Sequence, residues 1–253
     1  MIRLKSPKEI EILAEGGKIL AEVLQEIARA AKPGVTSMEV EELAQSLMVK
    51  FRVKSSFLGY EAGSHDPYPS VTCISINEGV VHGIPGNQKF AEGDLVGLDC
   101  GIIYKDMYLD AARTVGIGKV SPEAQKLMNV TREALRLGIE QARVGNRIGD
   151  IGAAVQAYAE SFGYGVVTQL VGHGVGYDVH EEPKVPNFGQ AGTGPVIEEG
   201  LVIAIEPMVT AGNPQVKTAK DGWTIETVDG SISAHEEHTV AVNKSGPKIL
   251  TAL

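Results

Sequence analysis

Cysteine, long apolar runs and aromatic residues are all scarce in this sequence, and the first two scarcities each exclude a class of protein. Only Cys73 and Cys100 are present, so the fold cannot depend on a framework of disulfide bridges. Apolar runs such as residues 201–205 are much shorter than the roughly 20 residues needed to cross a membrane. Residues 1–7 also lack the apolar core of a signal peptide. We therefore expect a cytoplasmic protein that does not associate with membranes.

Positive charge is in deficit as well, which argues against one kind of partner. The chain carries 23 Lys and Arg against 32 Asp and Glu, for a net charge of −9. A surface that binds a phosphate backbone needs an excess of Lys and Arg, so we expect no direct nucleic-acid function. The 253 residues are 43% hydrophobic, which is enough for a sizeable core. Because no linker is apparent, we predict a single domain over residues 1–253.

Helix signals occur in two pairs, each followed by apolar strands. Ser6, Pro7 and Glu9 form a capped helix start, and apolar residues continue at helical spacing until residues 33–34. A second capped start lies at residues 36–39, a third lies at 121–123, and a fourth helix is expected over 146–162. Two helices followed by strands, twice over, predict an α/β (α+β) fold built from two similar halves.

An apolar strand that ends on a carboxylate is the central feature of the first half. Residues 95–98 are typical of a buried strand, which follows a Gly-Asp turn and ends at Asp99. A hairpin folded about Tyr104 and Lys105 would place Asp99 opposite Asp110, with Cβ atoms about 5 Å apart. Two carboxylates at that distance repel unless they share a proton or a cation. The alternative is two separate surface aspartates at strand ends.

The second half repeats this arrangement. Residues 199–206 again run Glu-Gly, apolar strand and carboxylate, and they end at Glu206. A His-Gly pair precedes each strand, at His82 and at His173. A single histidine among apolar residues is more often structural than functional. The repetition of polar residues at strand ends nevertheless indicates a site between the two halves.

A run of four ionisable side chains, residues 235–238, supplies the last candidate. In a strand, residues 235 and 237 would face one side and residues 236 and 238 the other, although a solvated edge strand would look the same. Four carboxylates and one imidazole, with a formal charge of −4, would need compensating cations if buried together, and two divalent ions supply them. Paired ions about 3.5–4 Å apart activate water and polarise a substrate oxygen. Such ligands suit Mn, Fe, Co or Zn, and Mg less well. The candidate ligands are Asp99, Asp110, His173, Glu206 and Glu237.

Seven motifs, in order along the chain, are shared with one family. They are His82-Gly83-Ile84-Pro85, Asp99 and Asp110 at their spacing, Gly172-His173-Gly174-Val175-Gly176, His180-Glu181-Glu182-Pro183, Ile205-Glu206-Pro207-Met208, Asp221-Gly222-Trp223-Thr224 and Glu237-His238-Thr239. Over essentially its whole length the chain resembles the type I, bacterial-type methionine aminopeptidases, which form subfamily A of peptidase family M24. The resemblance implies a pita-bread fold, with two pseudo-symmetric halves and an antiparallel sheet core flanked by helices.

The resemblance also implies how the ligands are used. Asp99 and Asp110 would ligate one metal ion, His173 and Glu206 would join the other, and Asp110 and Glu237 would bridge the two. Water activated by the metal pair would attack the carbonyl of an N-terminal methionine, with Glu206 carrying the proton. The family prefers a small second residue, because a bulky one would clash with the wall of a closed pocket.

Further roles follow from the same resemblance. His180 would hold the scissile carbonyl or its oxyanion, and His82 would contact the next peptide nitrogen. The methionine pocket would be lined by Tyr60, Tyr68, Cys73 and Trp223, whose soft and aromatic surfaces suit a thioether. The expected partner is a peptide or nascent-chain N-terminus starting with Met, and a monomer is the family default. Ribosome association is expected of bacterial members, but Lys217 and Lys220 are too sparse to establish it.

Three stretches depart from the family pattern. The loop between Tyr60 and Tyr68 is longer than usual, which leaves the position of Tyr60 open. Val179 stands where many members carry an aromatic residue, so a wider pocket floor or rim is expected. His235 and Glu236 replace a more usual glutamine and aromatic residue, and the family gives no role to this extra histidine.

Two other functions fit parts of the pattern. A pita-bread peptidase that cleaves before proline would share the ligands, although such enzymes usually carry a large N-terminal domain and here a helix starts near Ser6. A non-catalytic relative that binds peptides, proteins or RNA is the second alternative. Such relatives typically lose metal ligands, whereas all five are present in this sequence.

Overall fold

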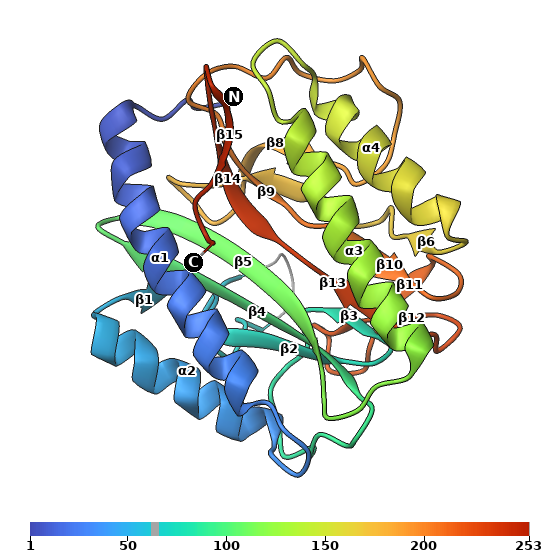
Figure 1. Cartoon of the computed structure of the whole chain (residues 1–253). Helices are drawn as coiled ribbons and strands as arrows, with labels where there is room; N and C mark the ends of the chain where they lie inside the picture. Colours follow the sequence, from blue (N-terminus) through green and yellow to red (C-terminus); the bar gives the residue numbers. More distant parts are fainter. Residues whose placement is uncertain (62–65, 253) are drawn as a thin grey trace.

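Helices and strands alternate in two blocks along the chain (Figure 1). The computed structural model describes residues 1–61 and 66–252. The first block comprises α1 (Pro7–Ala30), α2 (Ser37–Phe51), β1 (Lys54–Ser55), β2 (Thr72–Ile76), β3 (Gly79–Val81), β4 (Leu95–Tyr104) and β5 (Met107–Gly116). The second comprises α3 (Pro122–Gln141), α4 (Ile148–Ser161), β6 (Gly165–Val166), β7 (Gly172–Gly174), β8 (Glu181–Val185), β9 (Val202–Ile205), β10 (Met208–Thr210), β11 (Val216–Thr218), β12 (Ile225–Thr227), β13 (Ser233–His235), β14 (His238–Asn243) and β15 (Gly246–Ile249). The predicted order of elements is confirmed.

Three of the four described helices begin at the predicted caps. The Ser6 hydroxyl accepts from the backbone of Glu9, and the Glu9 carboxylate accepts in return from the backbone of Ser6. Thr36 and Glu39 form the same reciprocal pair at α2, and Ser121 caps α3. Each cap satisfies backbone N–H groups that have no partner inside the helix, which is typically worth about 1 kcal/mol.

Each helix pair covers one sheet. In the first half, β4 pairs with β1, β2 and β5, and its apolar side chains pack against Leu13 and Leu20 of α1 and Val40 of α2. In the second half, the strand order is β15-β14-β9-β7-β8, and the core under it includes Leu135 of α3 and Ile151 of α4. All strand pairs described are antiparallel. This is the predicted antiparallel core flanked by helices.

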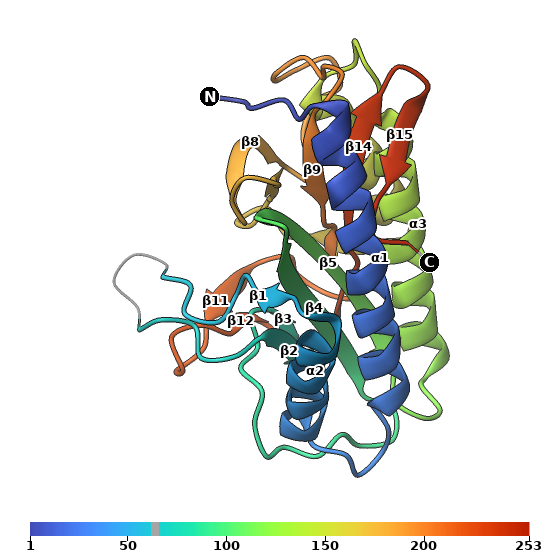
Figure 2. The same cartoon turned by 90° about the vertical axis from the view of Figure 1, so that its left-hand side faces the viewer.

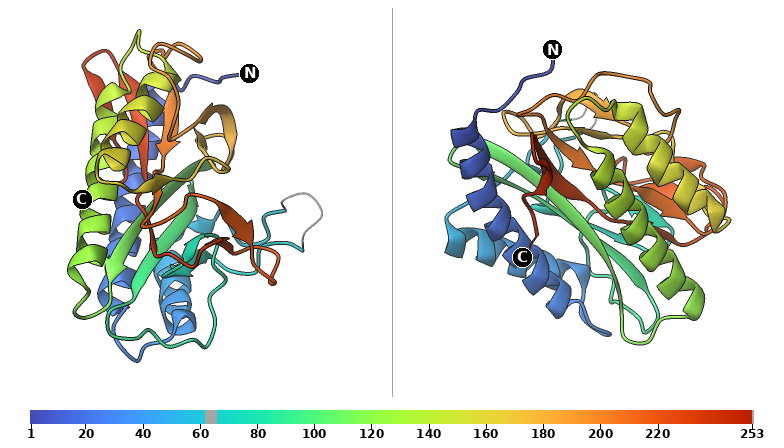
Figure 3. Two further views of the ribbon diagram at one scale, coloured as in Figure 1. Left: turned by 90° about the vertical axis from the view of Figure 1, so that its right-hand side faces the viewer. Right: turned by 45° about the horizontal axis from the view of Figure 1, so that its top comes forward.

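The layers leave one side of the strands without helices. Figure 2 shows α1 and α3 along one face, with β8, β11 and β12 projecting on the opposite side, and Figure 1 shows β14 between the two helices. Figure 3 shows the same arrangement from the other flank. Of the two smaller sheets, β11-β12-β3 joins strands of both halves, whereas β13-β10-β6 lies within the second half. No described helix is both long and apolar enough to span a membrane. That residues 1–253 form one domain stays a prediction.

Candidate metal centre and adjoining pocket

The first two predicted ligands lie on the β4–β5 hairpin, but in a different register from the one predicted. Asp110 pairs with Gly101, so the prediction that it lies opposite Asp99 is wrong. The turn consists of Lys105 and Asp106, which both have positive φ (49° and 62°), as a tight two-residue hairpin turn requires. Asp99 pairs instead with Ala112, two residues along β5 from Asp110. Residues two apart along a strand face the same side, so Asp99 and Asp110 remain diagonal neighbours on one face of the sheet.

The other three predicted ligands lie on, or directly beside, neighbouring strands of the second sheet. His173 is the middle residue of β7 and pairs with Ala204 of β9. Glu206 directly follows β9, and Glu237 directly precedes β14, which is the next strand in that sheet. Sheet pairing therefore collects three side chains that are far apart in the sequence.

Hydrogen bonds across the seam between the two sheets bring these groups to Asp110. The Thr239 hydroxyl donates to the backbone carbonyl of Asp110 (2.6 Å) and accepts from its backbone N–H (3.1 Å). The backbone N–H of Glu237 donates to the carbonyl of Ala112 (2.9 Å). The start of β14 is thus fixed directly beside β5. No role was predicted for Thr239, because no local pattern signals a bond between such distant residues.

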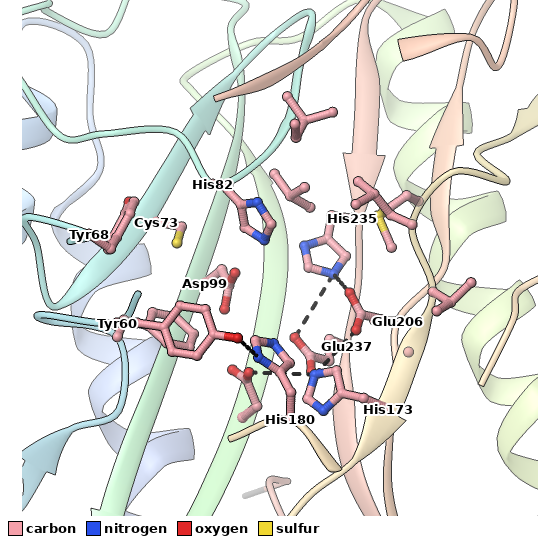
Figure 4. A pocket seen from close by; sticks show the side chains of 18 of the residues that line it. Tyr60, Tyr68, Cys73, His82, Asp99, His173, His180, Glu206, His235 and Glu237 are labelled. Carbon is pink, nitrogen blue, oxygen red and sulfur yellow. Dashed lines mark hydrogen bonds and ion pairs between the residues drawn. The ribbon is translucent and has the colours of Figure 1, made fainter. Parts of the chain in front are cut away.

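The orientation of His173 suits a metal ligand. Its Nδ1 lies 3.0 Å from the carbonyl oxygen of Gly174, which can only accept, so Nδ1 carries the proton. Its Nε2 lone pair then faces Glu206 Oε1 at 3.4 Å and Asp110 Oδ2 at 3.9 Å (Figure 4). Burial and the neighbouring His180 lower the pKa of His173 to about 3, which keeps the imidazole neutral. A second bond that fixes the tautomer is the usual arrangement for a ligating histidine.

Burial raises the pKa of all four carboxylates, and the charge of neighbouring acids raises it further for Asp99, Asp110 and Glu237. Burial, followed by the charge of Glu206, raises the pKa of Asp110 to about 7. Burial raises the pKa of Glu206 to about 8, and burial with neighbouring acids raises the pKa of Asp99 and of Glu237 well above the usual range. A cation held among them would reverse these shifts.

Unsatisfied atoms in this cluster match the requirements of a metal ion. Oδ1 of Asp99, Oδ1 of Asp110 and Oε1 of Glu237 are buried without a hydrogen-bond partner among the residues that the structure describes. Ligand atoms of Asp110, His173 and Glu237 all lie within 4.8 Å of one another. Buried oxygens need donors or cations, so the donor set fits divalent metal binding.

A cavity of about 720 Å³ adjoins the cluster and is large enough for part of a peptide. Tyr68 and Trp223 meet edge to face in its wall, with ring centroids 5.1 Å apart, and Cys73 lies nearby in the same apolar cluster. Phe57, which was not predicted to line the pocket, packs into that cluster and lines the cavity, and Val179 packs into the cluster as well. All the predicted substrate contacts line the cavity: Tyr60, Tyr68, Cys73, His82, His180 and Trp223.

Two further histidines border the cavity. His180 Nδ1 lies 2.9 Å from the hydroxyl of Tyr60, and burial raises the pKa of Tyr60, so the tyrosine keeps its proton. His82 follows β3 with a positive φ of 59°, which is uncommon outside glycine and is found at functional sites. Burial, with His180 and His235 nearby, lowers the pKa of His82 to about 4. The prediction about the longer loop falls partly on residues 62–65, outside the described residues.

Comparisons with known proteins agree with this geometry. The sequence profile of metallopeptidase family M24 matches residues 11–244. A methionine aminopeptidase of Clostridium acetobutylicum is 48% identical over 252 residues, covering 99% of each chain. The crystal structure of a methionine aminopeptidase from Thermotoga maritima superposes with a TM-score of 0.96 at 44% identity, covering all of both chains. A prolidase from Pyrococcus horikoshii reaches a TM-score of 0.76 at 25% identity, covering 98% of this chain and 63% of that one.

The chain belongs to metallopeptidase family M24, because the family profile spans most of its length. Within that family, the Clostridium and Thermotoga relatives, which match over essentially their full length, are methionine aminopeptidases, so the predicted resemblance is confirmed. The predicted pita-bread fold is confirmed as well, since the methionine aminopeptidase and the prolidase of this family share it.

Proposed function

We propose that this protein removes the N-terminal methionine from peptides and nascent proteins, by metal-dependent hydrolysis, when the second residue is small. Membership of family M24 and the full-length methionine aminopeptidase relatives support this function. The observation that carries it is the group of buried carboxylates around His173, which adjoins a cavity with an aromatic and sulfur-lined wall. One part supplies the hydrolytic chemistry and the other supplies a pocket for a thioether side chain.

We propose that Asp99, Asp110, His173, Glu206 and Glu237 hold two divalent ions, of Mn, Fe, Co or Zn. The charge of the four carboxylates and their unpartnered oxygens support a pair of ions rather than one. When bound, such ions polarise a carbonyl and lower the pKa of water. Glu206 lines the cavity, 3.4 Å from His173 Nε2, and would accept and return the proton of the attacking water.

The remaining roles belong to the pocket. If Tyr60 donates to Nδ1 of His180, the Nε2–H of His180 is free to hold the scissile carbonyl oxygen. His82 would contact the next peptide nitrogen. The methionine side chain would lie among Tyr68, Cys73 and Trp223.

The substrate partner is an N-terminus that begins with Met. Ribosome association and a monomeric state are further parts of the proposal, and we infer them from the family resemblance. Sedimentation with and without purified ribosomes would test both together.

The test of the function is release of free methionine from Met-Ala-Ser by metal-stripped protein to which Mn, Co, Fe or Zn is returned. We expect cleavage of Met-Ala-Ser to depend on the added metal and to be weak on Met-Leu-Ser. Glu206→Gln should lose nearly all of this activity, because it removes both a ligand charge and the proton acceptor.

Two outcomes would overturn the proposal. Cleavage of Ala-Pro-Ser but not Met-Ala-Ser would assign the chain to the peptidases that cleave before proline. Tight peptide binding with no release of methionine by folded protein, whichever metal is supplied, would assign it to the non-catalytic relatives.

A further inference from the structure

His235 is the one histidine of this site for which the family resemblance supplies no role. It ends β13 and pairs with Met208 of β10, so its backbone lies within a sheet. Its N–H donates to the Thr114 hydroxyl (2.9 Å), which in turn donates to its carbonyl (2.8 Å). Thr114 belongs to β5, the strand that carries Asp110. The imidazole is therefore held by the same rigid framework as the predicted ligands.

The His235 ring points into the carboxylate cluster (Figure 4). Its Nε2 lies 3.5 Å from Glu206 Oε2 and 3.9 Å from Glu237 Oε2. The side chain is only 3% exposed, and this Nε2 has no hydrogen-bond partner within residues 1–61 and 66–252. A buried nitrogen without a partner is rare in folded proteins, so its position requires an explanation.

The distances favour a shared cation over a direct hydrogen bond. A hydrogen bond from nitrogen to a carboxylate oxygen normally spans about 2.7–3.2 Å. Ligand atoms about 2.1 Å from one tetrahedral ion lie about 3.4 Å apart, close to the separations that His235 makes. Ligand atoms of Glu206, His235 and Glu237 all lie within 4.8 Å of one another, as do those of Asp110, His173 and Glu237.

We propose that His235 is an additional metal ligand, whose Nε2 binds, together with Glu206 and Glu237, a divalent ion of the same centre. This inference rests on the proposed metal-dependent function. The centre then offers two imidazole nitrogens, one on each side of Glu206. A nitrogen-richer centre favours Zn and Co over Mn, since imidazole suits the former and oxygen ligands suit the latter.

The contacts of Glu236 and His238 show why His235, and neither of these two residues, is proposed for this role. Glu236 faces away from the cluster and pairs with Arg132 (3.1 Å). His238 binds the hydroxyl of Thr251 through Nδ1 (3.0 Å) and does not line the cavity. His238 is therefore a matched control: a mostly buried histidine three residues away that lies outside the proposed ligand set.

The first test follows imidazole nitrogens by NMR in protein labelled with ¹⁵N-histidine, as Zn²⁺ is added to the metal-stripped full chain. We expect the Nε2 resonances of His173 and His235 both to move to the position of coordinated nitrogen, while the resonances of His238 stay unchanged. A shift at His173 without one at His235 would overturn this inference and leave the proposed function intact. No shift at either residue would count against the metal centre itself.

The second test compares His235→Gln with His238→Gln by competition dialysis for Zn²⁺ and Mn²⁺. We expect His235→Gln to lower the affinity for Zn²⁺ by at least about tenfold and the affinity for Mn²⁺ much less, because one nitrogen ligand is lost. His238→Gln should change neither affinity. Equal losses for both metals in His235→Gln, or none, would refute ligation by His235. Circular dichroism of each variant confirms that it is folded.

Discussion

His173 and His180 lie with ring centroids 4.4 Å apart, and each imidazole is oriented by a bond at Nδ1. The partner of His173 is a backbone carbonyl, which leaves Nε2 as a lone pair for a metal ion. The partner of His180 is a hydroxyl, which allows Nε2 to carry a proton. At the scale of single residues, the second bonds of these two adjacent histidines therefore suit the two different roles proposed for them.

Removing the partner of His180 tests this division. Tyr60→Phe should lower kcat about three- to tenfold with little change in KM, because a hydrogen bond worth about 1 kcal/mol that orients the ring is lost. His180→Asn should lower it by about 100-fold or more, as expected for an oxyanion donor. Steady-state kinetics on Met-Ala-Ser measure both.

Tyr158 does not line the cavity, so Tyr158→Phe is the control. Its kcat and KM should match those of the unaltered protein. A Tyr60→Phe variant with unchanged kcat and a raised KM would show that Tyr60 only lines the pocket.

At the scale of elements, the position of β14 against β5 determines the geometry of the centre. Thr239 donates to and accepts from the backbone of Asp110, so one side chain fixes β14 against the strand that carries Asp110. Thr239→Val should destabilise the fold by about 1–3 kcal/mol, since it leaves buried backbone groups unpaired. It should also weaken metal binding.

Chemical denaturation and dialysis against Zn²⁺ measure these two effects of Thr239→Val. Thr239→Ser keeps the hydroxyl and should retain most of both properties. If the serine variant loses as much as the valine variant, packing of the methyl group, and not the pair of bonds, holds the strands.

The packing of α1 against the C-terminal segment gives a second test at this scale. A Cβ on Gly17 would overlap the backbone carbonyl of Leu250, which cannot move aside as a flexible side chain can. Gly17→Ala should therefore lower the free energy of unfolding by about 1–3 kcal/mol, despite the better helix propensity of alanine. Gly86→Ala has open space around it and should be nearly neutral. A stabilised Gly17→Ala would mean that α1 and the C-terminal segment can separate without cost.

At the scale of the whole molecule, the carboxylates link metal binding to stability. In the metal-free protein the pKa of Asp110 is raised to about 7 and that of Glu206 to about 8, chiefly by burial. A raised folded-state pKa means that the folded state binds protons more tightly than the unfolded chain, where carboxyl groups titrate near pH 4. The stability contributed by these groups is therefore present below about pH 4 and is lost as the pH rises towards 8.

Denaturation of the EDTA-treated protein at pH 5.5 and pH 8.5 checks this prediction. We expect a loss of several kcal/mol at the higher pH, because each tenfold change in an ionisation constant corresponds to about 1.4 kcal/mol. Zn²⁺ should suppress the loss by balancing the charges, and Asp110→Asn should reduce it in metal-free protein. Higher stability of the metal-free protein at pH 8.5 would contradict the mutual burial of these acids.

Much of the fold and most of the candidate site could be predicted because their signals are local. Capping pairs mark the helix starts, and the repeated Glu-Gly, apolar run and carboxylate mark the two strands that lead to Asp99 and Glu206. The predicted register of the β4–β5 hairpin was wrong, because the turn lies at Lys105 and Asp106, one residue beyond the predicted position. The alternation of apolar residues does not distinguish these neighbouring turn positions. The positive φ of Lys105 and Asp106 identifies the turn only once the backbone is known.

By itself, the sequence determined the candidate ligands, the order of the elements and the repeat that relates the halves. These depend on residue type and on short-range spacing, which can both be read directly from the order of residues. Only the tertiary structure decided which distant atoms meet: the Thr239 bonds to Asp110, the Tyr60 bond to His180, and His235 among the carboxylates. The physical reason is that such contacts are made across sheets, where a shift of one residue in the pairing would point every side chain to the other face.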